Sequence, residues 1–185
     1  MRFNKHLKVQ GEHAFLSPSN YHWINYTPDR LADRWTTAQA AAWGSYQHEY
    51  AMNEIRAGRL SEHEGVLGMY INDCINDRME PEQVLFYSEN CFGTTDAISF
   101  RYKKLKIYDY KSGVIKASIH QLEVYAALFC LEYGIDPFDI DIELRIYQGD
   151  EVSVFDADPE DIKLIMDKIV EFDRQIEQLK REEES

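Results

Sequence analysis

The sequence lacks the features of a membrane protein, a disulfide scaffold and an ATP-driven motor. It has no run of about 18 apolar residues that could span a bilayer, and residues 1–13 lack the apolar region of a secretory signal. The three cysteines, Cys74, Cys91 and Cys130, show no C-x-x-C spacing, which favours reduced thiols. No G-x-x-x-x-G-K-[ST] loop occurs, so no ATP-driven unwinding is encoded. We therefore expect a cytoplasmic protein with no membrane partner.

Basic residues are scarce relative to acidic ones. The 185 residues include 20 Lys+Arg and 33 Asp+Glu, which gives a formal net charge of −13. This balance argues against a protein that coats nucleic acid non-specifically, because that class is basic overall. Apolar residues are plentiful: 44% of the chain is hydrophobic and 13% is aromatic, which suits one globular domain with a sizeable core.

Hydrophobic periodicity and turn residues predict the element order α-α-β-β-β-α-β-β-α. The expected helices cover residues 28–57, 61–77, 117–133 and 158 to the tail, and the expected strands cover 84–88, 94–100, 105–110, 140–146 and 152–155. An antiparallel hairpin, then a crossover helix, then a further strand predicts an α/β fold whose mixed central sheet is flanked by helices. Ser61 and Glu64 have capping-box spacing, which predicts that the second helix begins there.

The long C-terminal helix has two interpretations. Its apolar residues follow heptad spacing: Ile162, Ile165, Ile169, Phe172, Ile176 and Leu179. We favour a helix docked on its own domain, because Met166 and Val170 widen the apolar stripe early in the helix. The alternative is that its end pairs with another chain in a homo-oligomer. The expected organisation is a main domain over residues 1–157 and a C-terminal helix, docked or self-associating, over residues 158–185.

Two of the expected strands, residues 94–100 and 105–110, each interrupt their apolar alternation with an aspartate. If the loop between them has two or four residues, Asp96 lies opposite Asp109 on the face that carries the apolar side chains. Lys111 follows Asp109 by two positions and points the same way. A loop of three or five residues would instead put the aspartates on opposite faces.

Two carboxylates at that separation repel each other unless a cation lies between them. Mg²⁺ or Mn²⁺ would bind their oxygens together with substrate phosphate oxygens. A lysine beside the ion adds positive charge where a phosphate under attack by water develops negative charge. The alternative is a surface hairpin whose polar residues face solvent, but the opposed Asp96 favours a metal site.

Several motifs follow one another in a recognisable order. They are G-x-x-D at residues 93–96, D-x-K at 109–111 and Q-x-x-x-Y at 121–125, preceded by serines at 17 and 19 and by Gly44 and His48 in the first helix. This series resembles the signature of the PD-(D/E)XK nuclease superfamily, and more narrowly of its RecB-like exonuclease branch. The resemblance covers about residues 16 to 148, most of the chain.

The resemblance implies a restriction-endonuclease-like core within residues 1–157, which would form the nuclease domain. The implied catalytic residues are Asp96, Asp109, Lys111, Gln121 and Tyr125, and the implied metal ligands are His48, Asp96, Asp109 and the backbone carbonyl of Tyr110. Lys111 would orient or polarise the attacking water, whereas Gln121 and Tyr125 would contact the DNA backbone or brace the lysine. The metal would be Mg or Mn, and no other cofactor is implied.

The expected function is a divalent-metal-dependent DNA exonuclease that hydrolyses phosphodiester bonds, either alone or recruited to DNA by a protein partner. The alternatives are an endonuclease or nickase with the same site, and a non-catalytic acidic binding or inhibitory module on the nuclease fold. Several members of the branch hold an iron–sulfur cluster through three cysteines near the end of the domain. No cysteine follows Cys130 here, so we expect no cluster.

Two further features bear on the expected site. Six basic residues cluster in a stretch with a single acid and are expected to border the site and attract phosphates: Arg101, Lys103, Lys104, Lys106, Lys111 and Lys116. Glu89 precedes the G-x-x-D motif and is a further carboxylate whose role the sequence leaves open.

Overall fold

The computed structural model describes residue 8 and residues 14–183. Its contacts divide the chain into two units, residues 1–43 and 44–185. Most of residues 1–13, the segment that was searched for a secretory signal, lies outside the described residues. The last two residues of the acidic tail lie outside them as well. Among the described residues, no helix combines the length and the apolar character needed to cross a membrane.

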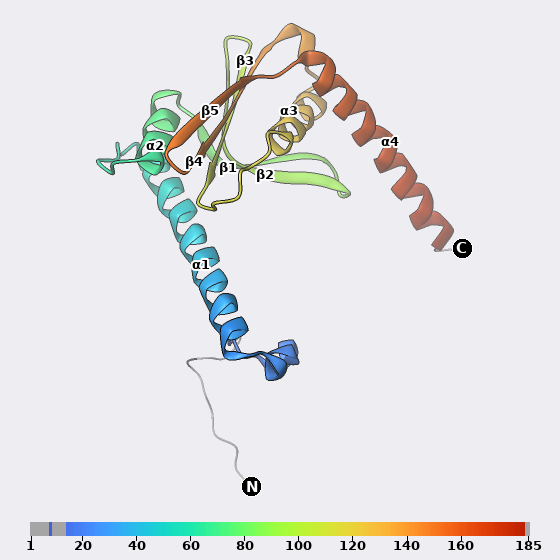
Figure 1. Cartoon of the computed structure of the whole chain (residues 1–185). Coiled ribbons are helices and arrows are strands. Elements are labelled where there is room, and N and C mark those ends of the chain that lie inside the picture. The colour runs from blue at the N-terminus through green and yellow to red at the C-terminus, as the bar shows by residue number, and fades with distance from the viewer. Residues whose placement is uncertain (1–7, 9–13, 184–185) are drawn as a thin grey trace. The chain divides into compact units, whose positions relative to one another are not determined.

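The first unit contains the short 3₁₀ segment η2 (Pro18–Asn25) and the beginning of α1 (Pro28–Ala57), which are drawn in blue in Figure 1. The rings of Phe15 and Trp35 meet edge to face, with their centroids 5.1 Å apart. None of the residues described in this unit is fully buried. Its aromatic side chains therefore remain accessible.

The second unit is built on a five-stranded sheet in the order β1-β2-β3-β4-β5. The strands are β1 (Glu80–Ser88), β2 (Cys91–Arg101), β3 (Lys104–Lys111), β4 (Asp141–Gln148) and β5 (Glu151–Asp156). Only β3 and β4 pair in parallel, and α3 (His120–Tyr133) makes the crossover between them. The predicted α/β fold with a mixed, helix-flanked sheet and a long C-terminal helix is confirmed.

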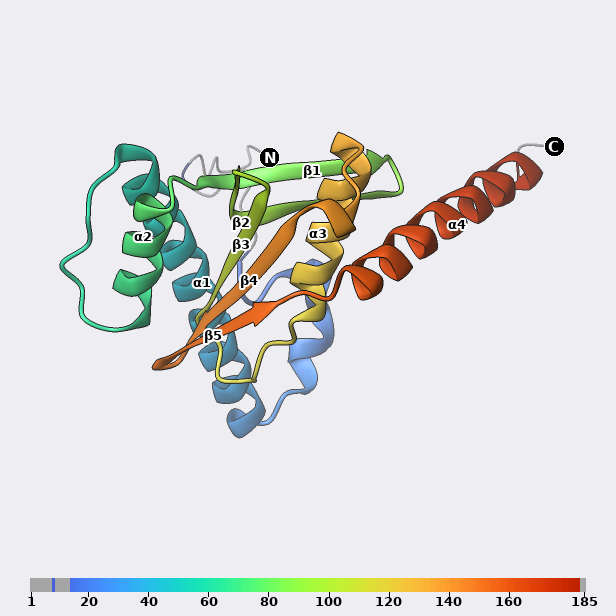
Figure 2. The same ribbon diagram turned by 90° about the horizontal axis from the view of Figure 1, so that it is seen from above.

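Helices cover both faces of the sheet (Figure 2). One face packs on α3 and on the start of α4 (Pro159–Glu183), and its core includes Leu105 and Ile107. The other face packs on α2 (Val66–Asn76) and the end of α1, and its core is rich in tyrosine, including Tyr108 and Tyr147. Because β2 and β3 lie between these layers, the side chains near their ends are partly shielded from water.

The start of α2 differs from the sequence prediction. The helix begins at Val66, with Gly65 at its N-cap in a positive-φ conformation (φ 94°), so the prediction of a capping box that starts the helix at Ser61 is wrong. The backbone of Ser61 is instead held by Asn72, whose side-chain amide both accepts from the Ser61 N–H and donates to its carbonyl. Gly65 separates the two segments because its backbone conformation is not helical.

The C-terminal helix α4 packs on the domain at its beginning, where Ile162 and Met166 are buried. Further along, the Asp173 carboxylate accepts hydrogen bonds from Ser88 and Asn90 in the turn that joins β1 to β2. Self-association through the exposed end of the helix, which includes Leu179, stays a prediction.

A polar network anchors β3, the strand that carries the predicted Asp-x-Lys motif. The Tyr108 hydroxyl lies within hydrogen-bond distance of Asp77 and Glu143, and Lys106 donates to Asp77. Burial alone would raise the pKa of Glu143, but hydrogen bonds from Lys104 and Tyr108 outweigh burial and lower it to about 2. These charge-assisted bonds fix the position of β3 between α2 and β4.

Candidate active site

The hairpin of β2 and β3 has the register that the sequence predicts for a two-residue loop. Its turn is Tyr102–Lys103, Phe100 pairs with Leu105, and Ile98 pairs with Ile107. Both turn residues have positive φ, the conformation of a type I′ hairpin turn. This register decides on which face the two aspartates lie.

The β2–β3 ladder ends at the pair Ala97 and Tyr108, one step before the aspartates. Beyond that step the register would place Asp96 opposite Asp109. The backbone N–H of Tyr110 donates to Asp96 Oδ2 at 2.9 Å, so the carboxylate of Asp96 replaces the next ladder contact. The structure therefore brings Asp96 to the end of β3, as the sequence predicts.

Asp109 is a buried carboxylate that is only partly satisfied. Its side chain accepts a hydrogen bond from Lys111 Nζ at Oδ1, at 2.9 Å, whereas its buried Oδ2 has no partner among the described residues. Burial first and the charge of Asp96 second raise the pKa of Asp109 to about 6, although Lys111 and His48 act in the opposite direction. A buried carboxylate oxygen without a partner requires an explanation, and a bound cation or water would supply one.

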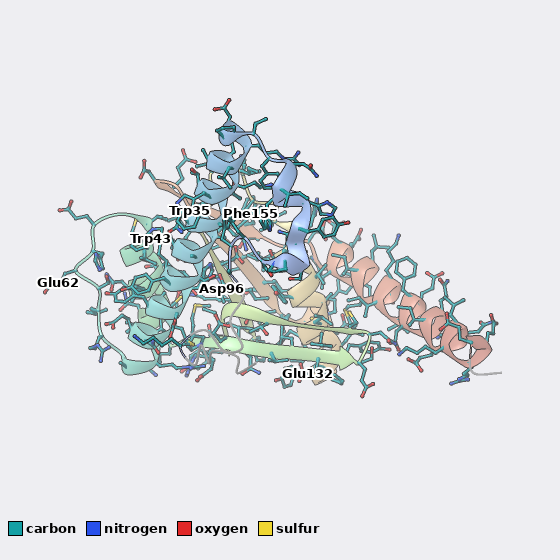
Figure 3. All side chains as sticks on the ribbon, turned by 90° about the horizontal axis from the view of Figure 1, so that it is seen from below. Trp35, Trp43, Glu62, Asp96, Glu132 and Phe155 are labelled. Atoms are coloured by element: carbon teal, nitrogen blue, oxygen red, sulfur yellow. The ribbon has the colours of Figure 1, made fainter. Side chains whose placement is uncertain are left out.

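His48 reaches this site from the second half of α1. Its Nδ1 lies 3.4 Å from Asp96 Oδ2, and its ring meets the Tyr110 ring edge to face at 5.5 Å. Gly44, one turn earlier, allows the close approach: a Cβ there would lie 2.6 Å from Ser112 Oγ, just beyond β3. Figure 3 labels Asp96 among the side chains where the sheet meets this helix. His48, an implied metal ligand, therefore contacts Asp96, another of the implied ligands.

Glu82 joins the site, and sequence reasoning missed it. One ligand atom each of His48, Glu82 and Asp96 lies within 4.8 Å of the others, and this group does not include Asp109. Glu82 lies in β1 with φ 55°, although it is not glycine. Holding a non-glycine residue in this backbone conformation costs about 1–3 kcal/mol, and such residues cluster at functional sites. Glu89, which the sequence left open, instead lies in the turn after β1.

Glu82 carried only a weak signal in the sequence. The predicted strand began at Val84, two residues later, so Glu82 was placed in a loop. In the structure Pro81 pairs with Ala97 and Gln83 pairs with Thr95, which puts Glu82 level with Asp96 across the β1–β2 ladder. Recognising this position from sequence would have required the register of β1 against β2.

Gln121 and Tyr125 brace β2. The Tyr125 hydroxyl donates to the carbonyl of Thr94 at 2.6 Å, and Gln121 Nε2 lies 3.4 Å from that hydroxyl. Gly93 makes room for the ring, since a Cβ at this position would lie 2.9 Å from Tyr125 Cε1. The G-x-x-D and Q-x-x-x-Y motifs thus contact each other two residues before Asp96. The predicted contact of Gln121 and Tyr125 with DNA stays a prediction.

The six basic residues do not form one patch beside the site. Lys104 pairs with Glu143, and Lys106 pairs with Asp77, so both charges are neutralised locally. Arg101 lies next to the turn of the hairpin, five residues from Asp96, which is about 17 Å along an extended strand. Within the described part of the chain, Lys111 is the one of the six that pairs with a site aspartate, Asp109, and the pairing of Lys104 and Lys106 elsewhere removes them from the expected phosphate-attracting surface.

The donor set fits a divalent cation. Carboxylate oxygens of Glu82 in β1 and Asp96 in β2 lie within 4.8 Å of each other and of a His48 ring nitrogen, and the neighbouring strand β3 carries the Asp109 oxygen that has no partner among the described residues. Oxygen-rich sets of this kind suit Mg²⁺ and Mn²⁺. The Tyr110 carbonyl stays a predicted ligand, while the N–H of the same residue holds Asp96.

Comparison with known proteins gives no family. No family model matches the chain, and no curated protein matches its sequence. The geometry of the site therefore carries the functional argument.

Proposed function

We propose that the protein is a divalent-metal-dependent deoxyribonuclease, an exonuclease of the RecB-like kind with a restriction-endonuclease-like core. The observation that carries this proposal is Asp109: a buried carboxylate with an unpartnered oxygen, beside Asp96 and 2.9 Å from the Lys111 amine. A purely structural ion pair would leave no reason to bring a second aspartate to this position. Perturbed titratable groups with named charge partners are typical of catalytic sites.

The proposed residues have separate roles. Asp96, Asp109 and His48 would hold the metal, with Glu82 as a further carboxylate ligand. The bound ion would supply a positive charge and a water molecule of lowered pKa. Lys111 places a cationic amine beside the reacting phosphate, where it stabilises the negative charge that develops in the transition state.

The remaining motif residues are positioning residues in this proposal. Tyr125 is bonded to the carbonyl of Thr94 and packs against Gly93, so it holds β2 where Asp96 leaves the ladder. Gln121 orients the Tyr125 hydroxyl. A rigid support of this kind matters because catalytic geometry tolerates displacements of only about 0.5 Å.

Substrate binding must overcome the formal net charge of −13. Because Lys104 and Lys106 are already paired with acids, these two lysines of the hairpin supply little free positive charge to a phosphate backbone. We therefore include recruitment by a protein partner in the proposal.

The proposal is tested by incubating end-labelled linear DNA and closed circular DNA with the protein in Mn²⁺, in Mg²⁺ and in EDTA. Degradation of the linear substrate alone, only with divalent metal, is the expected result. Cleavage of both substrates would identify an endonuclease or nickase with the same site. No cleavage of either substrate would reject the nuclease and favour a non-catalytic module.

The assay needs a variant that distinguishes cleavage at this site from cleavage by a contaminating nuclease. Asp96→Asn removes the charge while its side-chain oxygen can still accept the Tyr110 N–H, so we expect a folded and inactive protein. Asp139→Asn is the matched control, since Asp139 is exposed and lies in the short 3₁₀ helix η3 (Pro137–Asp139), away from the motifs. Equal activity in the two variants would locate cleavage outside this site.

Glu82 gives an independent prediction about the metal. We expect Glu82→Gln to weaken Mn²⁺ binding by about 10- to 100-fold, the range seen when a group that supports a metal site is removed. Isothermal titration calorimetry on the metal-free protein measures this directly. Glu80→Gln makes the same charge change in the same strand, where Glu80 is exposed and pairs with Ile98. Equal affinities in the two variants would exclude Glu82 as a ligand.

A further inference from the structure

The first unit contains a cavity that the proposed catalytic residues do not use. Its volume is about 450 Å³, within the range of small-ligand pockets. Its larger lining residues are Phe15, His22, Trp23, Tyr26, Arg30 and Arg34. None of the residues that line the cavity is acidic, as far as the described part of the chain goes, although acids outnumber basic residues by 33 to 20 in the sequence.

Two elements supply the aromatic and the cationic sides of this cavity. Trp23 and Tyr26 come from η2 and the turn after it, which Figure 1 draws beside the first turns of α1. Arg30 and Arg34 come from α1 and are four residues apart, so they lie one above the other on a single helix face. The cavity therefore presents rings opposite a row of guanidinium groups.

The aromatic side is partly preorganised. The indole N–H of Trp23 donates to the carbonyl of Ser17 at 2.9 Å, and the ring remains partly exposed. The Arg30 guanidinium carbon lies 4.7 Å from the centre of the Tyr26 ring, a cation–π distance. Because Arg30 covers this face of the Tyr26 ring, a planar ligand that stacks on Trp23, or that takes the place of Arg30 on Tyr26, would lie beside positive charge.

We propose that this cavity binds single-stranded nucleic acid, with a base stacked on Trp23 or Tyr26 and the neighbouring phosphates at Arg30 and Arg34. Aromatic rings and cations in one groove are what sequence-independent binding of a single strand requires. A duplex keeps its base faces within its own stack and cannot use the rings. The inference rests on the proposed function for its substrate class, and it adds that the substrate offers unpaired bases.

The test measures binding without catalysis. Fluorescence anisotropy of a labelled oligothymidylate in EDTA gives the affinity of the full chain and its dependence on salt. We expect Arg34→Ala to weaken binding about tenfold and to lower the slope of log K against log salt by about 0.7, the value for one phosphate contact with a single strand. Tyr26→Leu should lower affinity by about 5- to 100-fold with an unchanged salt slope, because it removes stacking and not charge.

Arg56→Ala is the matched control, because Arg56 is an exposed arginine of the same helix outside the cavity. Circular dichroism verifies that each variant keeps its helices. Equal losses in Arg34→Ala and Arg56→Ala would overturn the proposal, and so would equal affinity for a duplex of the same length. If the wild-type protein binds no oligonucleotide but forms a dimer, and Tyr26→Leu dissociates that dimer, the cavity is a protein interface instead.

Two further arms complete the design. Oligouridylate beside oligothymidylate shows whether the strand is RNA or DNA, since both carry the bases and phosphates that the cavity recognises. Because binding is measured in EDTA, intact binding without metal-dependent cleavage would reject the proposed function alone. Cleavage that depends on Asp96, with no single-strand binding at Arg34, would reject this inference alone.

Discussion

Replacing Lys111 with methionine is expected to slow DNA cleavage by about 10²–10³-fold, the cost of removing one positioned electrostatic group from an active site. The Lys111 amine lies 2.9 Å from Asp109 Oδ1 and is about one-third exposed, so it can also face a substrate phosphate. Methionine keeps much of the length of the side chain and removes its charge. Turnover at saturating Mn²⁺ and DNA measures the effect.

Metal binding serves as the control for this variant, because Lys111→Met should retain Mn²⁺ affinity within a few-fold. Lys116→Met removes the same charge from an exposed position in the loop after β3 and should keep wild-type turnover. If Lys111→Met turns over as fast as Lys116→Met, the lysine has no part in the chemistry. A loss of metal affinity equal to the loss of turnover would make Lys111 a support for Asp109 only.

Replacing Asp109 with asparagine is expected to abolish cleavage and, in metal-free solution at neutral pH, to stabilise the fold. Burial and the nearby Asp96 raise the pKa of Asp109 from 3.8 to about 6. Such a shift of roughly two units corresponds to about 3 kcal/mol, because one unit is worth about 1.4 kcal/mol. Above pH 6 the ionised carboxylate destabilises the folded state by this amount, and asparagine carries no charge.

The pH dependence gives the sign of this effect. A carboxyl group whose pKa is raised on folding favours the folded state while it is protonated, and that contribution is lost as the pH rises through the folded value. The stability gained by Asp109→Asn should therefore be small near pH 4, grow as the pH approaches the folded-state pKa of about 6, and level off above it. Thermal unfolding of the wild type and of Asp109→Asn, measured in EDTA at a series of pH values that spans pH 4 and pH 6, gives this difference in stability.

Metal reverses the comparison. A cation that binds only the folded wild-type protein raises its unfolding temperature, and above the dissociation constant the stabilisation grows with the logarithm of the free ion concentration. Mn²⁺ should therefore stabilise the wild type and have little effect on Asp109→Asn. Asp139→Asn, an exposed substitution, should behave like the wild type throughout. A lower unfolding temperature for Asp109→Asn in EDTA at neutral pH would show that the buried carboxylate is satisfied without metal.

The hairpin shows how far local sequence can predict a site. The alternation on either side of the turn gives one register for a loop of two or four residues, and the structure has the two-residue loop Tyr102–Lys103, whose register brings Asp96 and Asp109 to neighbouring positions. The alternation of side chains in a strand limits the possible registers, because a shift of one residue moves every side chain to the other face of the sheet. The position of His48 on the inner side of α1 was predictable from helical periodicity in the same way.

Two expectations failed, for different reasons. The capping box at Ser61 had the right spacing, but Gly65 interrupts the helix before Val66. The basic cluster was dispersed because Lys104 and Lys106 meet acids from β4 and from the end of α2, which sequence separation conceals. The first error therefore arose from the backbone conformation of one nearby glycine, and the second arose from partners that are distant in the chain.

The sequence by itself determined the order of the helices and strands and the mixed character of the sheet, because both follow from short-range periodicity and turn chemistry. Only the tertiary structure decided that Glu82 meets His48 and Asp96, and that one oxygen of Asp109 is buried without a partner. Both facts depend on the pairing of β1 with β2 and on helices packed over the sheet. Burial and distance between remote segments set the chemistry of these carboxylates, and no local pattern encodes either quantity.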